Sequence, residues 1–275
     1  MMMAMPFYGS YYETLSVVLD KGILMKILTT IPCYNENNIY VERVVEQLTS
    51  ISDVVIFSPV RWDIPNVHTE IRGKEYGQSL VFEPRQFILD NIHEYDYFLY
   101  NEDDLLITPD SLLHAVEVNE KISKVDIQNN VTFLRYELEN DVAEFVDLHP
   151  GHSVHLGGNG VSDVIRFVTK IDNEYYFSPW NLHSGTFLIS REQLEMLIHN
   201  DLFWTEAKAT YCGILESGAS SFNPWLRKLA PTSSYKKLMI HHMSNKYVFN
   251  PVKVNINFLD NLFNFIPEDL SKKYL

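Results

Sequence analysis

The pattern that most limits the fold lies near the start of the chain, where a strand, a helix and a second strand follow one another. The run KILTTI at Lys26–Ile31 has the composition of a buried strand. Apolar residues then recur at helical spacing from Val41 to Ile51, and DVVIFS at Asp53–Ser58 predicts the second strand. Because such a unit joins neighbouring parallel strands, it predicts an α/β fold of Rossmann-like character, with a mostly parallel sheet flanked by helices.

Further elements are predicted from local signals. Asn37 or Asn38 is expected to cap the first helix, whereas residues 61–81 are expected to be irregular. A capping box formed by Ser190 and Gln193 precedes another predicted helix. The other predicted elements are a strand at Tyr97–Tyr100, a helix starting at Thr108-Pro109, a strand at Val131–Arg135, a hairpin of Val164–Thr169 and Glu174–Ser178, a strand at Thr186–Ile189 and a late strand at Lys237–His241.

The 275 residues are enough for one large domain or two small ones. The sequence contains no repeat, low-complexity tract or linker that would divide it, so we expect one domain over residues 25–275, less regular in its second half. Met25 is a second possible start, directly before the first strand. Residues 1–24 are therefore either an upstream extension or part of the fold.

The chain is acidic, and its charge excludes some classes of partner. It has 22 Lys and Arg against 36 Asp and Glu, a formal net charge of −14. This balance argues against a general nucleic-acid binder and against an anionic membrane surface. Only two cysteines, Cys33 and Cys212, are present, which fits a reducing compartment. With no apolar run near the roughly 20 residues needed to cross a bilayer, we expect a cytoplasmic protein.

Three adjacent carboxylates form the strongest chemical signal. Glu102, Asp103 and Asp104 directly follow the predicted strand at Tyr97–Tyr100. Their mutual repulsion is relieved by a cation, and oxygen-rich sites at strand ends suit Mg²⁺ or Mn²⁺. A solvated acidic turn is the alternative, but the strand before the triplet and the helix start after it favour the metal site.

A second polar segment, PCYNE, follows the first predicted strand. In parallel sheets the carboxyl ends of the strands lie at one edge, so we expect this segment beside the acidic triplet. Tyr34 is a candidate to stack on a base, and Asn35 or Glu36 to hydrogen-bond a base or ribose. An ordinary loop between a strand and a helix is the alternative.

The two segments together resemble glycosyltransferases of the GT-A fold that use nucleotide sugars. IPCYNE is similar to the IPxYNE entry of a large family of inverting transferases, and YDYFLYNEDDLLITPDSL is similar to a GT-A metal-binding segment. The resemblance covers residues 26–138. It implies that Asp104 binds the metal directly, that Glu102 and Asp103 act through water or the ribose, and that Pro32 belongs to the nucleotide site. The nucleotide-sugar half would be residues 25–138 and the acceptor half residues 139–275.

The resemblance also suggests partners for these segments elsewhere in the chain. Many GT-A enzymes complete their metal site with a C-terminal histidine, and His241 or His242 is the candidate, better suited to Mn²⁺ than to Mg²⁺. The other candidates are Lys246 for the diphosphate, Arg61 and Arg85 for the nucleotide, and Trp180 for stacking on a sugar, with the Ser184-Gly185 turn allowing close approach. Each also has an ordinary structural interpretation.

An inverting transfer needs a general base near the acceptor hydroxyl. Glu216 is the candidate, with Asp201 and Glu206 as rivals. We therefore expect a metal-dependent glycosyltransferase that moves a sugar from a nucleoside-diphosphate sugar to a glycan or other hydroxyl acceptor. The alternatives are a sugar nucleotidyltransferase and an inactive carbohydrate-binding protein with the same fold. A nucleotidyltransferase usually has a Gly-rich basic loop after its first strand, which PCYNENN is not.

Overall fold

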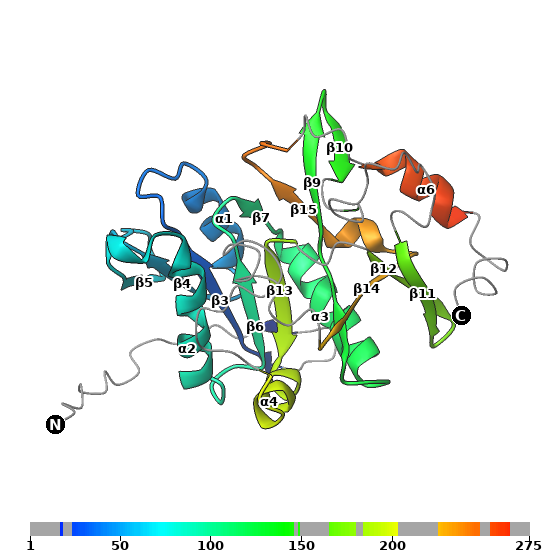
Figure 1. The fold of residues 1–275 in the computed structure, drawn as a ribbon, viewed down its shortest axis with the longest axis horizontal. Helices are drawn as coiled ribbons and strands as arrows, with labels where there is room; N and C mark the ends of the chain where they lie inside the picture. Colours follow the sequence, from blue (N-terminus) through cyan, green and yellow to red (C-terminus); the bar gives the residue numbers. More distant parts are fainter. Residues whose placement is uncertain are drawn as a thin grey trace.

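A five-stranded sheet organises the part of the chain that the structure describes, residues 17–18, 24–145, 148, 165–179, 184–202, 225–247 and 254–264 of a computed structural model. The strand order is β13-β6-β3-β4-β5 (Figure 1). These strands are β3 (Ile27–Pro32), β4 (Asp53–Ser58), β5 (Val67–Ile71), β6 (Tyr97–Asn101) and β13 (Thr186–Ser190). Only the β6–β13 pair is antiparallel, which confirms the mixed α/β fold with a mostly parallel sheet.

Helices cover both faces of this sheet. Side chains alternate along a strand, so Ile27 and Ile31 pack on one face with helices α1 (Val41–Leu48) and α3 (Pro109–Ser123). Leu28 packs on the other face with helices α2 (Glu83–Asp90) and α4 (Arg191–His199). A strand that is covered on both faces needs side chains suited to burial at nearly every position. This explains why β3 and β4 stand out in the sequence.

Several local signals define the ends of elements as expected. Thr108 caps α3, with its side-chain oxygen accepting a hydrogen bond from Ser111 N, and the capping box of Ser190 and Gln193 is present at the start of α4. The hairpin is formed by strands β11 (Ile165–Ile171) and β12 (Glu174–Pro179).

Two expected strands have different bounds in the structure. The strand expected at Val131–Arg135 is divided between β8 (Asn129–Val131) and β9 (Leu134–Glu139). The late strand expected from Lys237 begins only at Met239, because a 3₁₀ helix covers Tyr235–Leu238.

Two other local expectations are wrong. The first helix begins after Tyr40, and no side chain caps it. Asn38 instead accepts a hydrogen bond from Tyr40 N at 2.8 Å, which shapes the loop before the helix. The segment expected to be irregular contains β5 and a 3₁₀ helix, η1 (Lys74–Phe82). β5 lies at the edge of the sheet and is only partly buried, so it lacks the apolar run that marks a central strand.

Later residues contribute to two further sheets. One has the order β16-β10-β9-β15-β7 and the other the order β11-β12-β14-β8. Their remaining strands are β7 (Leu105–Leu106), β8 (Asn129–Val131), β9 (Leu134–Glu139), β10 (Val142–Phe145), β14 (Arg227–Pro231), β15 (Met239–His242) and β16 (Val254–Asn255). The other elements are the strand pair β1 (Val17–Val18) and β2 (Leu24–Met25), the 3₁₀ helix η4 (Tyr235–Leu238) and helix α6 (Ile256–Asn264).

The acidic triplet is the link between two of these sheets. β6 ends at Asn101 in the first sheet, and β7 begins at Leu105 in the second. In that second sheet β15 pairs with β7, and the register places His242 opposite Leu105. The three carboxylates therefore lie where a strand from the C-terminal part of the chain meets the central sheet. Among the described residues, no helix has both the length and the hydropathy that crossing a bilayer requires.

Candidate functional site

The main chain of the acidic triplet is held by two neighbours. Asn101 is fully buried, and its amide nitrogen donates to the carbonyls of Glu102, at 3.0 Å, and Leu105, at 2.9 Å. Glu102 N donates to Gly185 O at 3.0 Å. Gly185 has φ +67°, and a Cβ there would stand 2.6 Å from Glu102 Oε2. The positive φ favours glycine at this position, and a Cβ would force the Glu102 carboxylate to shift.

Asp104 has two cationic or potentially cationic side chains beside it. Its Oδ2 lies 3.0 Å from His242 Nε2 and 3.6 Å from Lys246 Nζ. His242 is fully buried, whereas Lys246 is about half exposed. The pairing of β15 with β7 brings the histidine here across 138 residues of sequence. Met243 N also donates to Asp104 O, which ties the turn after β15 to the triplet.

The three carboxyl groups differ strongly in their acidity. Burial opposes ionisation of Asp104, but its hydrogen bond to His242 and the charges of His242 and Lys246 outweigh burial and lower its pKa to about 2. Burial and the negative charge of Asp104 raise the pKa of Asp103 to about 6. Burial, opposed by Arg135, raises the pKa of Glu102 to about 7. Only Asp104 is therefore held firmly as an anion in the absence of a bound cation.

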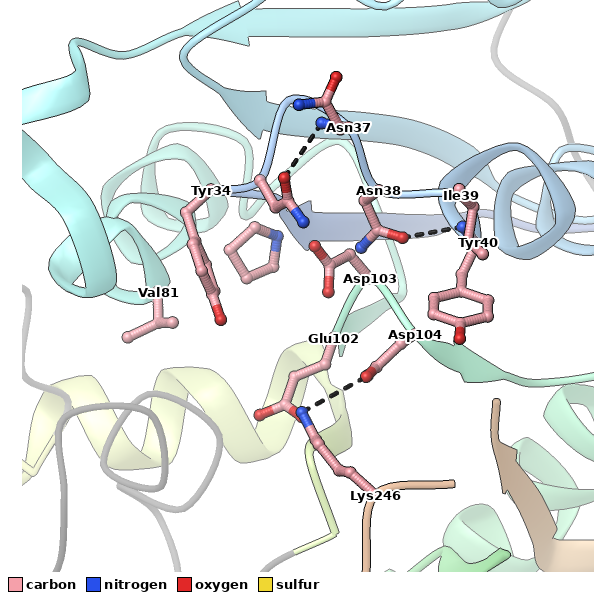
Figure 2. A pocket seen from close by; sticks show the side chains of 12 residues that line it. Tyr34, Asn37, Asn38, Ile39, Tyr40, Val81, Glu102, Asp103, Asp104 and Lys246 are labelled. Atoms are coloured by element: carbon pink, nitrogen blue, oxygen red, sulfur yellow. Dashed lines mark hydrogen bonds and ion pairs between the residues drawn. The ribbon is translucent and has the colours of Figure 1, made fainter. Parts of the chain in front are cut away.

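The triplet forms the floor of a pocket of about 340 Å³ at the carboxyl ends of β3 and β6 (Figure 2). Asn37 and Asn38 lie on one side of Asp103, and Lys246 lies beyond Asp104 on the other. The lining residues are Pro32, Tyr34, Asn35, Asn37, Asn38, Ile39, Tyr40, Val81, Glu102, Asp103, Asp104 and Lys246. The two segments singled out in the sequence thus share one pocket.

A smaller pocket of about 230 Å³ continues from the first along the same loop. It shares Tyr34, Asn35 and Asn37 with the larger pocket and adds Glu36, which forms an ion pair with Lys74 at 3.0 Å. Tyr34 is 46% exposed and lies between the two pockets. Its ring therefore offers an aromatic face to a ligand that occupies both pockets.

Asp104 and His242 could hold a divalent ion, but they are only part of a coordination shell. Among the described residues, no group of three or more histidine, cysteine or acidic side chains converges as a complete metal site. Mg²⁺ and Mn²⁺ are commonly bound by one or two protein side chains plus substrate phosphates and water. The carboxylate and imidazole here fit an ion that arrives with a phosphate ligand better than a permanently bound structural ion.

Three candidate residues from the sequence lie away from the two pockets. His241 neighbours His242 on a strand, so its side chain points to the opposite face, where its ring stacks on Tyr136. Arg61 is 82% exposed and lies 3.8 Å from Asp63. Arg85 is buried against the Phe82 ring, and burial lowers its pKa to about 10. None of the three lines either pocket.

The second-half candidates are less well defined. Trp180, Glu206 and Glu216 lie outside the described residues. Asp201 is exposed just after α4. That helix follows Ser190, which pairs with Tyr97 at the amino end of β6, the edge of the sheet opposite the pocket.

The structure adds one participant that the sequence analysis missed. Glu137 on β9 is fully buried, and its Oε1 lies 2.5 Å from His242 Nδ1. Arg135, two residues earlier on the same face of β9, is also buried. Leu138 lies on the other face of the strand and is exposed. Charged residues at alternate positions with an apolar residue facing outwards are the signal that could have drawn attention to this strand.

Comparisons with known proteins yield structural similarities alone. No protein-family model matches the sequence, and a search of curated proteins returned no match. A glycosyltransferase involved in glycosylation of the major capsid of PBCV-1 is 11% identical, with a TM-score of 0.33 over 87% of this chain and 99% of that one. A mannose-1-phosphate geranyltransferase from Thermus thermophilus is 9% identical, with a TM-score of 0.37 over 79% of this chain and 74% of that one. At TM-scores below 0.5, neither similarity assigns a family or an activity.

Proposed function

We propose that the chain is a metal-dependent glycosyltransferase that moves a sugar from a nucleoside-diphosphate sugar to an acceptor hydroxyl. The observation that carries the proposal is the contact at 3.0 Å between Asp104, which lines a pocket whose opposite side is the loop after β3, and His242, which is buried behind Asp104. An anion-rich floor beside a polar and aromatic loop suits a ligand with a diphosphate at one end and a nucleoside at the other. A divalent ion reconciles that anionic ligand with the carboxylates.

The residues around Asp104 suit departure of a diphosphate. A divalent ion held by Asp104 and His242 would neutralise the diphosphate and so stabilise it as a leaving group. Lys246 is half exposed and 3.6 Å from Asp104, so its ammonium group can reach a phosphate oxygen in the same pocket. A preorganised cation of this kind stabilises the charge that develops as the bond to the sugar breaks.

The loop after β3 suits the nucleoside. Tyr34 offers a partly exposed ring for stacking, and Asn35 and Glu36 offer hydrogen-bonding groups beside it. Asn35 is already oriented, because its Oδ1 accepts a hydrogen bond from Asn37 N at 3.1 Å. This leaves its amide nitrogen to face a ligand acceptor.

The finer assignments are part of the same proposal. Mn²⁺ is the preferred ion, because an imidazole ligand suits it better than Mg²⁺. The transfer inverts the sugar configuration, with Glu216 as the general base and Trp180 stacking on a sugar, and the acceptor is a glycan or another hydroxyl compound. The protein works in the cytoplasm, in keeping with its two cysteines.

A donor screen tests the proposal. The full chain is incubated with a panel of nucleotide sugars, with Mn²⁺ or with excess chelator, and release of nucleoside diphosphate is measured. We expect release with one donor, dependent on Mn²⁺ and increased by an acceptor. Full release in excess chelator would contradict the metal-dependent mechanism.

The same screen separates the alternatives. A nucleotidyltransferase would instead release pyrophosphate from a nucleoside triphosphate and a sugar 1-phosphate. An inactive binding protein would bind a donor in the presence of Mn²⁺ without ever releasing the diphosphate. The anomeric configuration of the product, measured by NMR, decides between inversion and retention.

A further inference from the structure

Glu137 is a buried carboxylate whose two oxygens are used by groups at the candidate site. Oε1 lies 2.5 Å from His242 Nδ1, and Oε2 accepts a hydrogen bond from Tyr247 N at 2.8 Å. Both the glutamate and the histidine have side chains that are 0% exposed. A carboxylate buried this deeply lowers stability unless all its oxygens are satisfied, so its partners are an essential part of the local structure.

The contact fixes which ring nitrogen of His242 faces Asp104. An ionised carboxylate only accepts hydrogen bonds, so Nδ1 is the nitrogen that donates to Glu137. By the same rule Nε2, on the other side of the ring, donates to Asp104 Oδ2 at 3.0 Å in the metal-free protein, with Ser244 Oγ at 2.8 Å. A metal ion bound to Nε2 would take the place of this proton, which leaves to solvent. The ring also stacks on Tyr247, at a centroid distance of 5.5 Å, so it is held in its plane as well as at one edge.

Glu137 also holds the turn that carries Lys246. The hydrogen bond from Tyr247 N lies one residue beyond this lysine, and Leu138 N donates to Asn245 Oδ1 on its other side. Glu137 therefore holds the main chain after Lys246, and Leu138, the next residue of β9, holds the side chain of Asn245 before it. The same glutamate thus orients two of the groups that face Asp104.

We propose that Glu137 is a positioning residue for the candidate metal site, orienting His242 Nε2 and the turn carrying Lys246 towards Asp104. The proposal deepens the proposed function and depends on it for its consequence in metal binding. Partners of this kind, which accept a hydrogen bond from the second nitrogen of a ligating histidine, typically change metal affinity 10- to 100-fold when they are replaced.

The test compares Glu137→Gln with Glu144→Gln. Glu144 is also buried, lies opposite Glu137 in the register of β9 and β10, and is bonded to Asn255 rather than to His242. Mn²⁺ binding in the presence of inorganic pyrophosphate is measured by electron paramagnetic resonance. We expect about 10- to 100-fold weaker binding for Glu137→Gln and unchanged binding for Glu144→Gln, with both variants folded by circular dichroism.

A double-mutant cycle separates positioning from a general structural effect. If Glu137 acts through His242, then Glu137→Gln added to His242→Ala weakens Mn²⁺ binding little beyond His242→Ala alone. Equal effects of the glutamate substitution in both backgrounds would overturn the orientation of His242 by Glu137. So would unchanged binding in a folded Glu137→Gln variant.

A measurement without metal keeps this inference distinct from the proposed function. In the metal-free protein, the His242 Nδ1–H proton is expected far downfield in the NMR spectrum because it is bonded to a carboxylate, and to move upfield in Glu137→Gln but not in Glu144→Gln. If the native chain fails to bind Mn²⁺ with pyrophosphate, the metal-dependent function fails. The position of this proton still shows whether Glu137 orients the ring, and an unchanged resonance in Glu137→Gln overturns that.

Discussion

The two sides of the pocket are built in different ways. On one side, the loop between β3 and α1 is shaped by hydrogen bonds between residues two positions apart, Asn35 with Asn37 and Asn38 with Tyr40. On the other side, His242 and the turn after it are held by Glu137 and Asp104, which are more than 100 residues away in sequence. The first side is local and exposed, and the second is long-range and buried.

This difference predicts how each side responds to change. Side chains of the local loop reach solvent, so replacing one removes a ligand contact and leaves the core intact. On the long-range side, Glu137 and His242 are buried and paired, so replacing one removes a hydrogen-bond partner from the other, which stays buried. Binding and stability should therefore separate on the first side and change together on the second.

The largest effect is expected for Asp104→Asn, at the centre of the site. The substitution removes the carboxylate that is held as an anion while it keeps the side-chain shape, and kcat should fall about 10³-fold or more. Turnover is measured with the donor identified by the screen. Asp63→Asn is the control, because Asp63 is almost fully exposed and lines neither pocket. Near-normal turnover of Asp104→Asn would place the metal elsewhere.

The second prediction compares two adjacent histidines. His242→Ala leaves the buried Glu137 carboxylate without the imidazole that pairs with it, so the free energy of unfolding should fall by about 3 kcal/mol or more. His241→Ala loses a partly exposed stacking contact with Tyr136, and the expected loss is about 1 kcal/mol. Urea unfolding monitored by circular dichroism measures both. Equal losses in the free energy of unfolding would mean that the buried pair of Glu137 and His242 stabilises the protein no more than the partly exposed stacking contact does.

The contrast between the two sides also explains what could be predicted from the sequence. The central strands and the acidic triplet are marked by continuous apolar runs that end in polar residues, so β3, β6 and their shared edge were predicted correctly. The caps at Thr108 and Ser190 are equally local signals. The edge strand β5 was missed because partial burial leaves no such run.

The long-range side could be predicted only in part. The sequence suggested a histidine from the pair at His241 and His242, but which of them faces Asp104 depends on the register of β15 against β7. A shift of one residue would exchange the two faces, and no local pattern fixes that register. Glu137 was missed for the same reason, since its partner is 105 residues away.

The third prediction concerns Gly185, which touches the triplet from β13's side of the sheet. A Cβ at this position would collide with Glu102 and would also impose φ +67° on a non-glycine residue. Gly185→Ala should therefore lower the free energy of unfolding by about 2 kcal/mol or more. The matched comparison is Gly185→Ala in the native chain and in a Glu102→Ala background, where the nearest colliding carboxylate is gone and only about 1 kcal/mol, the cost of the positive φ, is expected. Similar losses in both would show that Glu102 moves aside without penalty.

The smallest effect is expected on the local side of the pocket, at Tyr34. Because the ring is 46% exposed, Tyr34→Ala should leave the free energy of unfolding within about 0.5 kcal/mol of the native value. If the ring stacks on a base, donor KM should rise about 10-fold with little change in kcat, and Tyr34→Phe should restore it. Isothermal titration with the donor and Mn²⁺ measures the affinity directly.

Tyr76→Ala is the control for Tyr34→Ala, because Tyr76 is 36% exposed on η1 and lines neither pocket. If both alanine variants bind the donor normally, the loop after β3 does not hold the nucleoside by stacking. If Tyr34→Ala instead unfolds as readily as His242→Ala, the local side contributes to the core as much as the long-range side does. In that case the two sides differ in their sequence separation but not in their physical role.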